Sequence, residues 1–269
     1  MVSTPVSINA AQTRVSNAIR SASLRSGVDF SYLFNQARIE SGLNPAAQAR
    51  TSSARGLYQF IDQTWLATVR RHGQEHGLGW AADAIRHNRG GRFSVDDPAT
   101  RRSIMALRDN PEVAAAMAAE FASDNRDHLE SALGRAAEPV DLYLAHFLGA
   151  GGATRFLRAH DADPSAPAAP MLPQAAHANR SIFYDRSGNP RSLSAIRARF
   201  AERLGAGAGA MPSANATPFD AAAPQPTPQN AIWRPMPSDQ LMGAQSPSTA
   251  RLAYLMLASL GAESLGAEI

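Results

Sequence analysis

The apolar pattern of this sequence stops near residue 204, and this change constrains the fold more than any other feature. Before it, apolar residues recur at helical spacing over most of the chain. After it, residues 205–248 are rich in proline, alanine and glycine and have almost no periodic apolar pattern. Such a composition buries too little apolar surface to offset the entropy lost on ordering. We therefore predict one folded domain over 1–204 and a disordered linker over 205–248.

The last segment regains apolar spacing. Leu252, Leu255, Met256 and Leu260 recur as on one face of a helix, which predicts a short amphipathic helix over 249–262. This helix either packs back on the domain or binds a partner at the end of a flexible tether.

The predicted domain is all-α. The apolar spacing and the Asp, Asn, Pro and Gly signals at helix ends predict helices over 7–25, 30–41, 62 or 64 to 73, 80–87, 98–108, 111–123, 125–133, 139–148 and 192–203. Strand-like alternation is nearly absent, with short extended pieces expected at 53–60 and 181–184 and a Pro/Ala-rich loop at 161–175.

Composition excludes several classes of function. The chain has no cysteine, which rules out disulfides, thiol catalysis and thiolate metal sites. Its 26 basic residues are all arginine, which rules out a Schiff-base or P-loop lysine. The whole chain has a net charge of +3 and residues 204–269 carry 2 − 4 = −2, so the segment before them carries +5. This suits an anionic polymer or surface, but it is too dilute to indicate nucleic acid. No stretch reaches the apolar length of a membrane span.

The histidines do not predict a metal site. His72 and His76 are four residues apart, but Gly73 intervenes and no acidic third ligand is evident. We therefore expect neither a metal nor a cofactor.

Glu40 is a carboxylate in an unusual place. It continues the apolar row of Leu33 and Ala37, so it should face the core. It also lies in the last turn before Gly42, where the negative end of the helix dipole disfavours a carboxylate. Burial and the dipole both favour the protonated carboxyl, which suits a general acid working near neutral pH. The alternative is a glutamate at a frayed, exposed helix end.

Two linked motifs can bring residue types that suit a sugar around this carboxyl, and a third motif follows later in the chain. ESGLNP at 40–45 leads through a polar loop into SSARGLYQF at 52–60, and AHFLGAGGA lies at 145–153. Hydroxyls and amides suit the polar edge of a sugar, and aromatic rings suit its apolar face. Over roughly residues 20–205 the chain resembles the soluble lytic transglycosylase (SLT) domain of the goose-type lysozyme superfamily.

The resemblance implies a lysozyme-like helical fold that cleaves peptidoglycan. The family uses the glutamate of the first motif as its single catalytic acid and base, which here is Glu40. It protonates the oxygen between N-acetylmuramic acid and N-acetylglucosamine. The resulting carboxylate then takes the proton of the sugar's 6-hydroxyl, which leaves a 1,6-anhydro end and consumes no water.

The resemblance also supplies substrate-binding candidates in the second motif. Gln59 matches the family glutamine that lines the acetamide pocket. Ser53 is expected to contact substrate or to support the loop, and Tyr58 either stacks on a sugar or packs in the core. Ser41, next to the acid, either aligns it or ends the helix.

The third motif departs from the commonest family form, in which Ala-Tyr-Asn precedes the variable residue and the glycine. Here His146 and Phe147 replace the tyrosine and the asparagine. His146 thus takes the place of a tyrosine that hydrogen-bonds near the acid, and Tyr143, one turn earlier, is an alternative source of that hydroxyl. Tyr184 is a candidate for a further tyrosine motif of the family.

Two alternatives compete with a lytic transglycosylase: a hydrolytic muramidase of the same fold, and a non-catalytic wall-binding or assembly module. Many glycosidases use two carboxylates, for which Asp62, Glu120 and Asp141 qualify by composition alone. Nothing in the sequence ties any of them to Glu40, so we favour chemistry with one carboxylate.

The expected partners are glycan strands and, through the tail, an envelope-machine protein; a monomer without nucleic acid is expected. The resemblance implies work in the periplasm or cell envelope. The first 25 residues lack the basic start and apolar segment of a secretory signal, so the export route is open and a phage-associated enzyme is an alternative.

Overall fold

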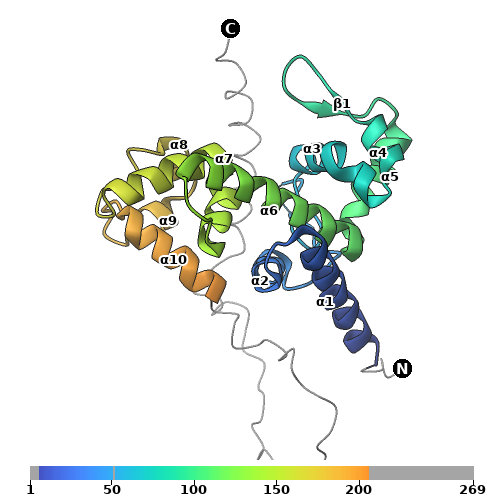
Figure 1. Ribbon diagram of the computed structural model, residues 1–269, viewed down its shortest axis with the longest axis horizontal. Helices are drawn as coiled ribbons and strands as arrows, with labels where there is room; N and C mark the ends of the chain where they lie inside the picture. The colour runs from blue at the N-terminus through green and yellow to red at the C-terminus, as the bar shows by residue number, and fades with distance from the viewer. Residues whose placement is uncertain (1–5, 51, 206–269) are drawn as a thin grey trace, which may run out of the picture.

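The computed structural model describes residues 6–50 and 52–205, and this part of the chain is all-α, as predicted (Figure 1). The predicted terminal helix at 249–262, and the predicted linker beyond its first residue, lie outside the described residues. The helices are α1 Val6–Ser26, α2 Phe30–Ser41, α3 Asp62–His72, α4 Gly79–Ala84, α5 Pro98–Ala106, α6 Pro111–Leu133, α7 Pro139–Ala162, α8 Pro173–Ala178, α9 Arg180–Phe183 and α10 Leu193–Gly205. Two 3-10 turns, η1 Gly73–His76 and η2 Leu107–Asp109, and one hairpin of β1 Arg86–His87 with β2 Phe93–Ser94 complete the set.

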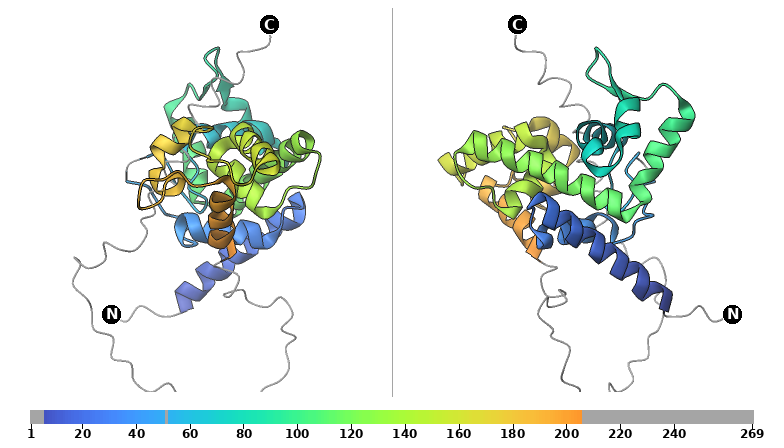
Figure 2. Two further views of the ribbon diagram at one scale, coloured as in Figure 1. Left: turned by 90° about the vertical axis from the view of Figure 1, so that its left-hand side faces the viewer. Right: turned by 45° about the vertical axis from the view of Figure 1, so that its right-hand side comes forward.

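Helices α6 and α7 run across the molecule, and α1, α3 and α10 pack against them (Figure 1). Helix α1 packs along α6, and α10 packs along α7. Helix α2 contacts α1, α6 and α10, so it lies between α1 and α10 (Figure 1), and Figure 2 shows these helices from two further sides. Its central place makes α2 the element best suited to hold a buried functional group.

The ends of α2 follow from its sequence. The Asp29 side chain accepts a hydrogen bond from the Tyr32 N–H and caps the first turn. Gly42 adopts the left-handed conformation, and its N–H bonds back to the carbonyls of the last turn. Glu40 therefore lies in the last turn, as predicted.

Helix α7 contains a break at Gly149. This residue has φ 73° and ψ 157°, a conformation that is essentially restricted to glycine. The break separates the predicted helix 139–148 from a second helical stretch that continues to Ala162. The second stretch occupies the start of the region where we predicted a loop, and α8 occupies its end.

Three other local predictions were wrong. The two helices expected over 111–123 and 125–133 are the single helix α6, because nothing between them breaks a helix. The helix expected over 80–87 ends at Ala84, and the next residues form the hairpin that turns at Gly90 and Gly91. The extended piece expected at 181–184 is mostly helix α9, with only Tyr184 in a β-bridge.

The predicted extended piece at 53–60 is present in part. Arg55 forms β-bridges with Gln48 and with Phe60, so the loop folds back on itself as it returns from α2 to α3. Trp65 at the start of α3 is fully buried, and its indole N–H donates to the Ile104 carbonyl, which assigns it to the core. No helix within the described residues has the length and apolar character needed to cross a bilayer.

Candidate active site

Three polar side chains form a row along the buried face of α2. Tyr32, Gln36 and Glu40 are spaced four residues apart, and all three are buried. The Glu40 side chain exposes 1% of its surface. The prediction that Glu40 faces the core is therefore confirmed, and the alternative of an exposed helix end is excluded.

His146 on α7 joins Glu40 to Gln36. Its Nε2 lies 3.2 Å from Glu40 Oε1, and its Nδ1 lies 2.9 Å from Gln36 Nε2. Because an amide nitrogen only donates, Nδ1 accepts this hydrogen bond, and the proton of a neutral ring is then on Nε2. The imidazole therefore donates to the Glu40 carboxylate. Gln36 Oε1 is buried without a hydrogen-bond partner among the described residues.

Buried tyrosines surround this pair. The Tyr143 ring stacks on His146, with centroids 5.9 Å apart and planes within 7°. Burial raises the pKa of Tyr143, and the nearby Glu40 carboxylate raises it further. Burial also raises the pKa of Tyr32 well above its usual range, with further contributions from Tyr143, Tyr58 and Glu40. These phenols stay protonated, so they are hydrogen-bond donors within electrostatic reach of Glu40.

Ser41 ties the end of α2 to the second motif. Its hydroxyl lies 2.7 Å from the Leu57 carbonyl oxygen and 3.0 Å from the Ala37 carbonyl oxygen. Ser41 thus fixes the end of α2 against the loop, and whether it also aligns Glu40 stays a prediction.

Arg108 in η2 holds the loop on its other side. The guanidinium is buried, and its Nη1 donates to the carbonyls of Ser53 and Phe60 and to Asp62 Oδ1. The backbone of Gly56 passes so close that a Cβ built there would lie 2.0 Å from the Arg108 carbonyl oxygen. Only a glycine therefore allows this loop to pack on η2.

The second-motif candidates are largely engaged within the protein. Both amide hydrogens of Gln59 point at loop carbonyls, those of Gly56 at 2.9 Å and Ala47 at 3.0 Å. Ser53 is exposed, and its Oγ accepts from the Asp62 N–H at the start of α3. Tyr58 is buried in the core, where burial raises its pKa. Their roles toward substrate stay predictions.

Tyr184 lies in a different setting. The Arg180 guanidinium stacks 4.6 Å above its ring, and both residues line a hollow of about 400 Å³ with Pro173 and His177. No contact given for the described residues joins Tyr184 to Glu40, so its role also stays a prediction.

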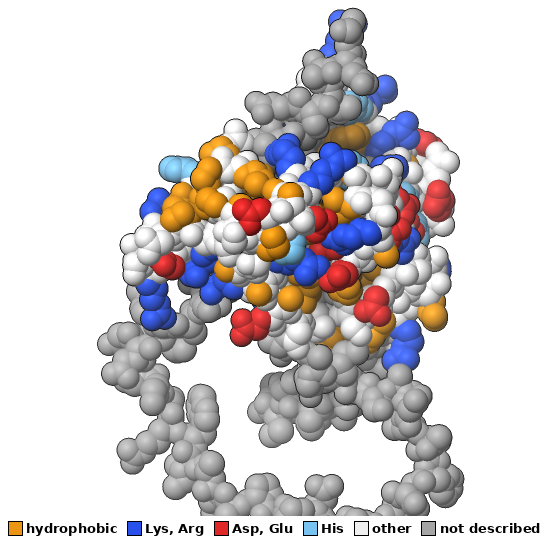
Figure 3. All heavy atoms as spheres, turned by 60° about the vertical axis from the view of Figure 1, so that its left-hand side comes forward, with side chains coloured by type: hydrophobic (Ala, Val, Ile, Leu, Met, Phe, Trp, Pro, Cys, Tyr) orange, Lys and Arg blue, Asp and Glu red, His pale blue; other side chains and the backbone are white. Residues whose placement is uncertain are grey.

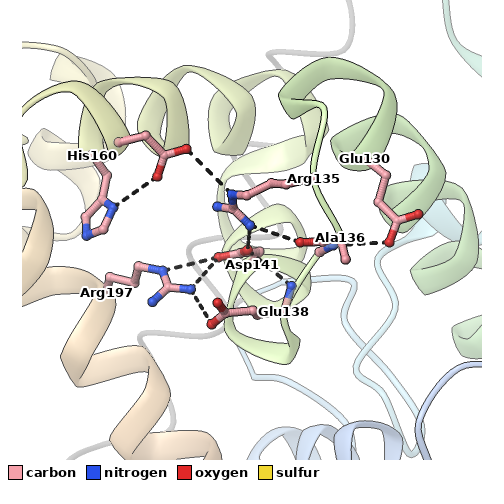
Figure 4. A network of polar contacts seen from close by, with 9 residues as sticks. Glu130, Arg135, Ala136, Glu138, Asp141, His160 and Arg197 are labelled. Atoms are coloured by element: carbon pink, nitrogen blue, oxygen red, sulfur yellow. Dashed lines mark hydrogen bonds and ion pairs between the residues drawn. The ribbon is translucent and has the colours of Figure 1, made fainter.

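The three possible second carboxylates each have basic partners. Asp62 pairs with Arg108 and Arg101. Asp141 is fully buried between Arg135 and Arg197 (Figure 4).

Glu120 belongs to a small histidine cluster. It lies 2.9 Å from His76 and 3.6 Å from His72, which also contacts Asp124 at 2.9 Å. Within 6–50 and 52–205, no group of three or more such side chains has the arrangement of a metal site.

Figure 3 shows basic side chains lying among acidic ones over the face that is on the left in Figure 1. On this face the charges alternate, which gives no support to a nucleic-acid partner.

The sequence analysis did not identify Tyr32 and Gln36 as residues of the candidate site, and it did not identify Arg108 as the residue that holds the nearby loop. Tyr32 and Gln36 lie at four-residue steps before Glu40, so the spacing that placed Glu40 on the core face could also have found them. No local sequence pattern indicates the role of Arg108, because its contacts join segments about fifty residues apart.

The family model of the transglycosylase SLT domain matches residues 17–79. The match confirms the resemblance seen in the motifs, and a lysozyme-like all-α fold goes with it. It is a family of cell-wall enzymes that act on peptidoglycan. The matched segment contains Glu40 and the second motif, whereas Tyr143, His146 and Tyr184 lie outside it.

Proposed function

We propose that this chain, whose residues 17–79 match the transglycosylase SLT domain, is a peptidoglycan lytic transglycosylase with Glu40 as its single acid and base. One observation carries the proposal: Glu40 is a buried carboxyl whose hydrogen-bond partner is an imidazole rather than a permanent cation. Such a group can gain and lose a proton, which acid–base catalysis requires.

In the first step, the protonated Glu40 donates to the oxygen between N-acetylmuramic acid and N-acetylglucosamine. The bond from the muramic C1 to that oxygen breaks, and the acetamide of the substrate supports the cation that develops at C1. The Glu40 carboxylate is now stabilised by the Nε2–H of His146, 3.2 Å away.

In the second step, Glu40 takes the proton of the 6-hydroxyl of the same sugar. The O6 atom bonds to C1 and gives the 1,6-anhydro ring, and the carboxyl returns to its protonated form. No water enters, so protons and atoms balance without a second carboxylate. The arginine partners of Asp62 and Asp141 support this assignment, because an arginine is a permanent cation.

Access to the acid is part of the proposal. Proton transfer needs the glycosidic oxygen within about 2.6–3.2 Å of the carboxyl. Because the Glu40 side chain exposes 1% of its surface, we expect the binding of a glycan strand to displace some of the groups that cover it.

Product analysis tests the reaction type. The full chain is incubated with purified sacculi, and the soluble muropeptides are identified by mass spectrometry. We expect anhydromuropeptides. Products heavier by one water would instead assign a hydrolytic muramidase, and binding without any product would assign a wall-binding module.

We also propose separate roles for the domain and for the tail. Residues 1–204 would form the catalytic domain in the periplasm or cell envelope, and the tail would recruit it to an envelope-spanning machine. Deletion of 205–269 should then abolish localisation and spare activity on sacculi in vitro. Loss of activity in vitro would contradict this division.

A further inference from the structure

Two hydrogen bonds link α2 to α7 through a single imidazole. The amide nitrogen Nε2 of Gln36 lies 2.9 Å from His146 Nδ1, and His146 Nε2 lies 3.2 Å from Glu40 Oε1. Gln36 and Glu40 are four residues apart on α2, so both contacts come from one face of one helix. The imidazole is therefore held at both nitrogens, and the Tyr143 ring stacks on its plane.

The amide of Gln36 decides where the imidazole proton lies. An amide nitrogen only donates, so a proton on His146 Nδ1 would meet the amide hydrogens of Gln36. The proton of the neutral ring is then on Nε2, where it points at Glu40. In the other tautomer, a lone pair on Nε2 would face the Glu40 carboxylate, and the two would repel each other.

This arrangement makes the two oxygens of Glu40 different. Oε1 accepts from the imidazole, whereas within 6–50 and 52–205 no side chain or backbone group donates to Oε2. An oxygen that already faces an N–H is a poor place for a further proton, so the neutral carboxyl carries its proton on Oε2. In the proposed reaction, Oε2 would give that proton to the glycosidic oxygen and take one back from the 6-hydroxyl. The protons of His146 and Gln36 stay in place throughout.

The contribution of Gln36 to stability does not explain its presence. The side chain is buried in the core, and its Oε1 has no hydrogen-bond partner among the described residues. A buried polar atom without a partner costs free energy, which an aliphatic side chain of similar size would avoid. What Gln36 provides in return is the donor to His146 Nδ1.

We propose that Gln36 is a positioning residue for the reaction: through His146 it keeps Glu40 Oε1 as an acceptor and leaves Oε2 to carry the transferred proton. This inference rests on the proposed function, because it concerns the acid of that reaction. It also belongs to a chain with histidine in the third motif, since the tyrosine of the commonest family form has no second ring nitrogen to orient.

NMR spectroscopy of the full chain with 15N-labelled histidine reads the position of the proton directly. The chain has seven histidines, and the signals that disappear in His146→Phe identify His146. In neutral buffer we expect a protonated Nε2 and an unprotonated Nδ1. Gln36→Glu places an acceptor against Nδ1 and should move a proton onto it.

Asn35→Leu is the matched control for this measurement. Asn35 is the preceding residue of α2, and it is also a buried amide whose oxygen has no partner among the described residues. It makes no contact with His146 among the hydrogen bonds of these residues, so both ring signals should stay as in the parent. A protonated Nδ1 in the parent chain would overturn the proposal. So would parent-like ring signals in a Gln36→Glu variant whose thermal unfolding shows that it is folded.

Kinetics on soluble glycan oligomers separate positioning from a structural role. Gln36→Leu should lower kcat about tenfold, the factor that one hydrogen bond is worth, and should change KM less. The same substitution in a His146→Phe background should have little further effect, because the imidazole through which Gln36 acts is then absent.

Equal losses of kcat in both backgrounds, or an unchanged kcat in folded Gln36→Leu, would overturn the proposal. If the wild type releases no product from any oligomer, the proposed function fails instead. The NMR measurement needs no turnover, so it still decides whether Gln36 fixes the proton of His146.

Discussion

Glu40 and Asp141 are both buried carboxylates on helices, and their surroundings are opposite. Asp141 accepts hydrogen bonds from Arg135 at 2.7 Å and Arg197 at 3.0 Å, and from the backbone of Glu138 (Figure 4). Glu40 contacts one imidazole at 3.2 Å. Two guanidiniums pair with Asp141, so this carboxylate joins α7 to α10 as part of a structural ion-pair cluster. A buried carboxyl can serve in proton transfer only where no permanent cation pairs with it.

The largest expected difference between the two carboxylates is in activity. Glu40→Gln should lower the rate of release from sacculi by about 10²–10⁴-fold, because the amide cannot transfer a proton. Asp141→Asn should change the rate per folded molecule far less. Release is measured by chromatography of the soluble products, with the folded fraction taken from circular dichroism. A rate near that of the wild type in Glu40→Gln would remove the assignment of the acid.

For the free energy of unfolding, we expect a large effect of substitution at Asp141. Asp141→Asn leaves two guanidiniums without their shared anion and should lower the free energy of unfolding by about 3–5 kcal/mol. Glu138→Gln is the control, because Glu138 pairs with Arg197 at the surface and should cost about 1 kcal/mol or less. Urea unfolding measures both. Equal losses would mean that burial adds nothing to the Asp141 cluster.

Substitution of two glycines tests how tightly the loop that follows α2 packs against η2. Gly56→Ala combines a positive φ with a clash against the Arg108 backbone and should cost about 2–4 kcal/mol. Gly134→Ala has a similar φ of 68° and nothing within 4 Å of the new Cβ, so about 1 kcal/mol is expected. Thermal unfolding of the two variants checks the difference. Similar melting temperatures would show that the loop can move away from η2.

The partner of Glu40 should matter for rate. His146→Phe removes the donor to the carboxylate and should slow cleavage about 10–100-fold. His146→Tyr restores a hydroxyl and should recover part of the loss. Rates on sacculi decide this, and an unchanged rate in His146→Phe would mean that the imidazole only fills space.

The smallest effect is expected at Ser41. Ser41→Ala removes the hydrogen bond to the Leu57 carbonyl and should lower the free energy of unfolding by about 1 kcal/mol. Chemical denaturation measures it. A loss of activity much larger than the loss of stability would assign the serine a direct part in aligning Glu40.

Local signals made much of the fold predictable. Asp29 and Gly42 bound α2, and Asn110 and Pro111 begin α6, because capping depends on neighbouring residues only. The hairpin at 86–94 was missed, although the paired glycines at its turn were a usable signal.

Within helix α2, the position of a candidate site residue could be predicted from the sequence. Contacts between side chains of different elements could not. Helical spacing placed Glu40 in the core, and the motifs named His146. That His146 also bonds Gln36, and that Arg108 holds the loop, depends on side chains brought together by packing. The hollow lined by Arg38 and Arg203 likewise combines α2 with α10, which are far apart in the chain.

The break at Gly149 has a consequence for how such an enzyme could be altered. Its backbone angles set the direction in which the rest of α7 leaves, and α8 to α10 follow it in the chain. A substituted side chain at that point would have to adopt other angles, and the second stretch of α7 would then leave the first in another direction. The residue at 149 therefore fixes how the stretch that carries His146 continues toward α8.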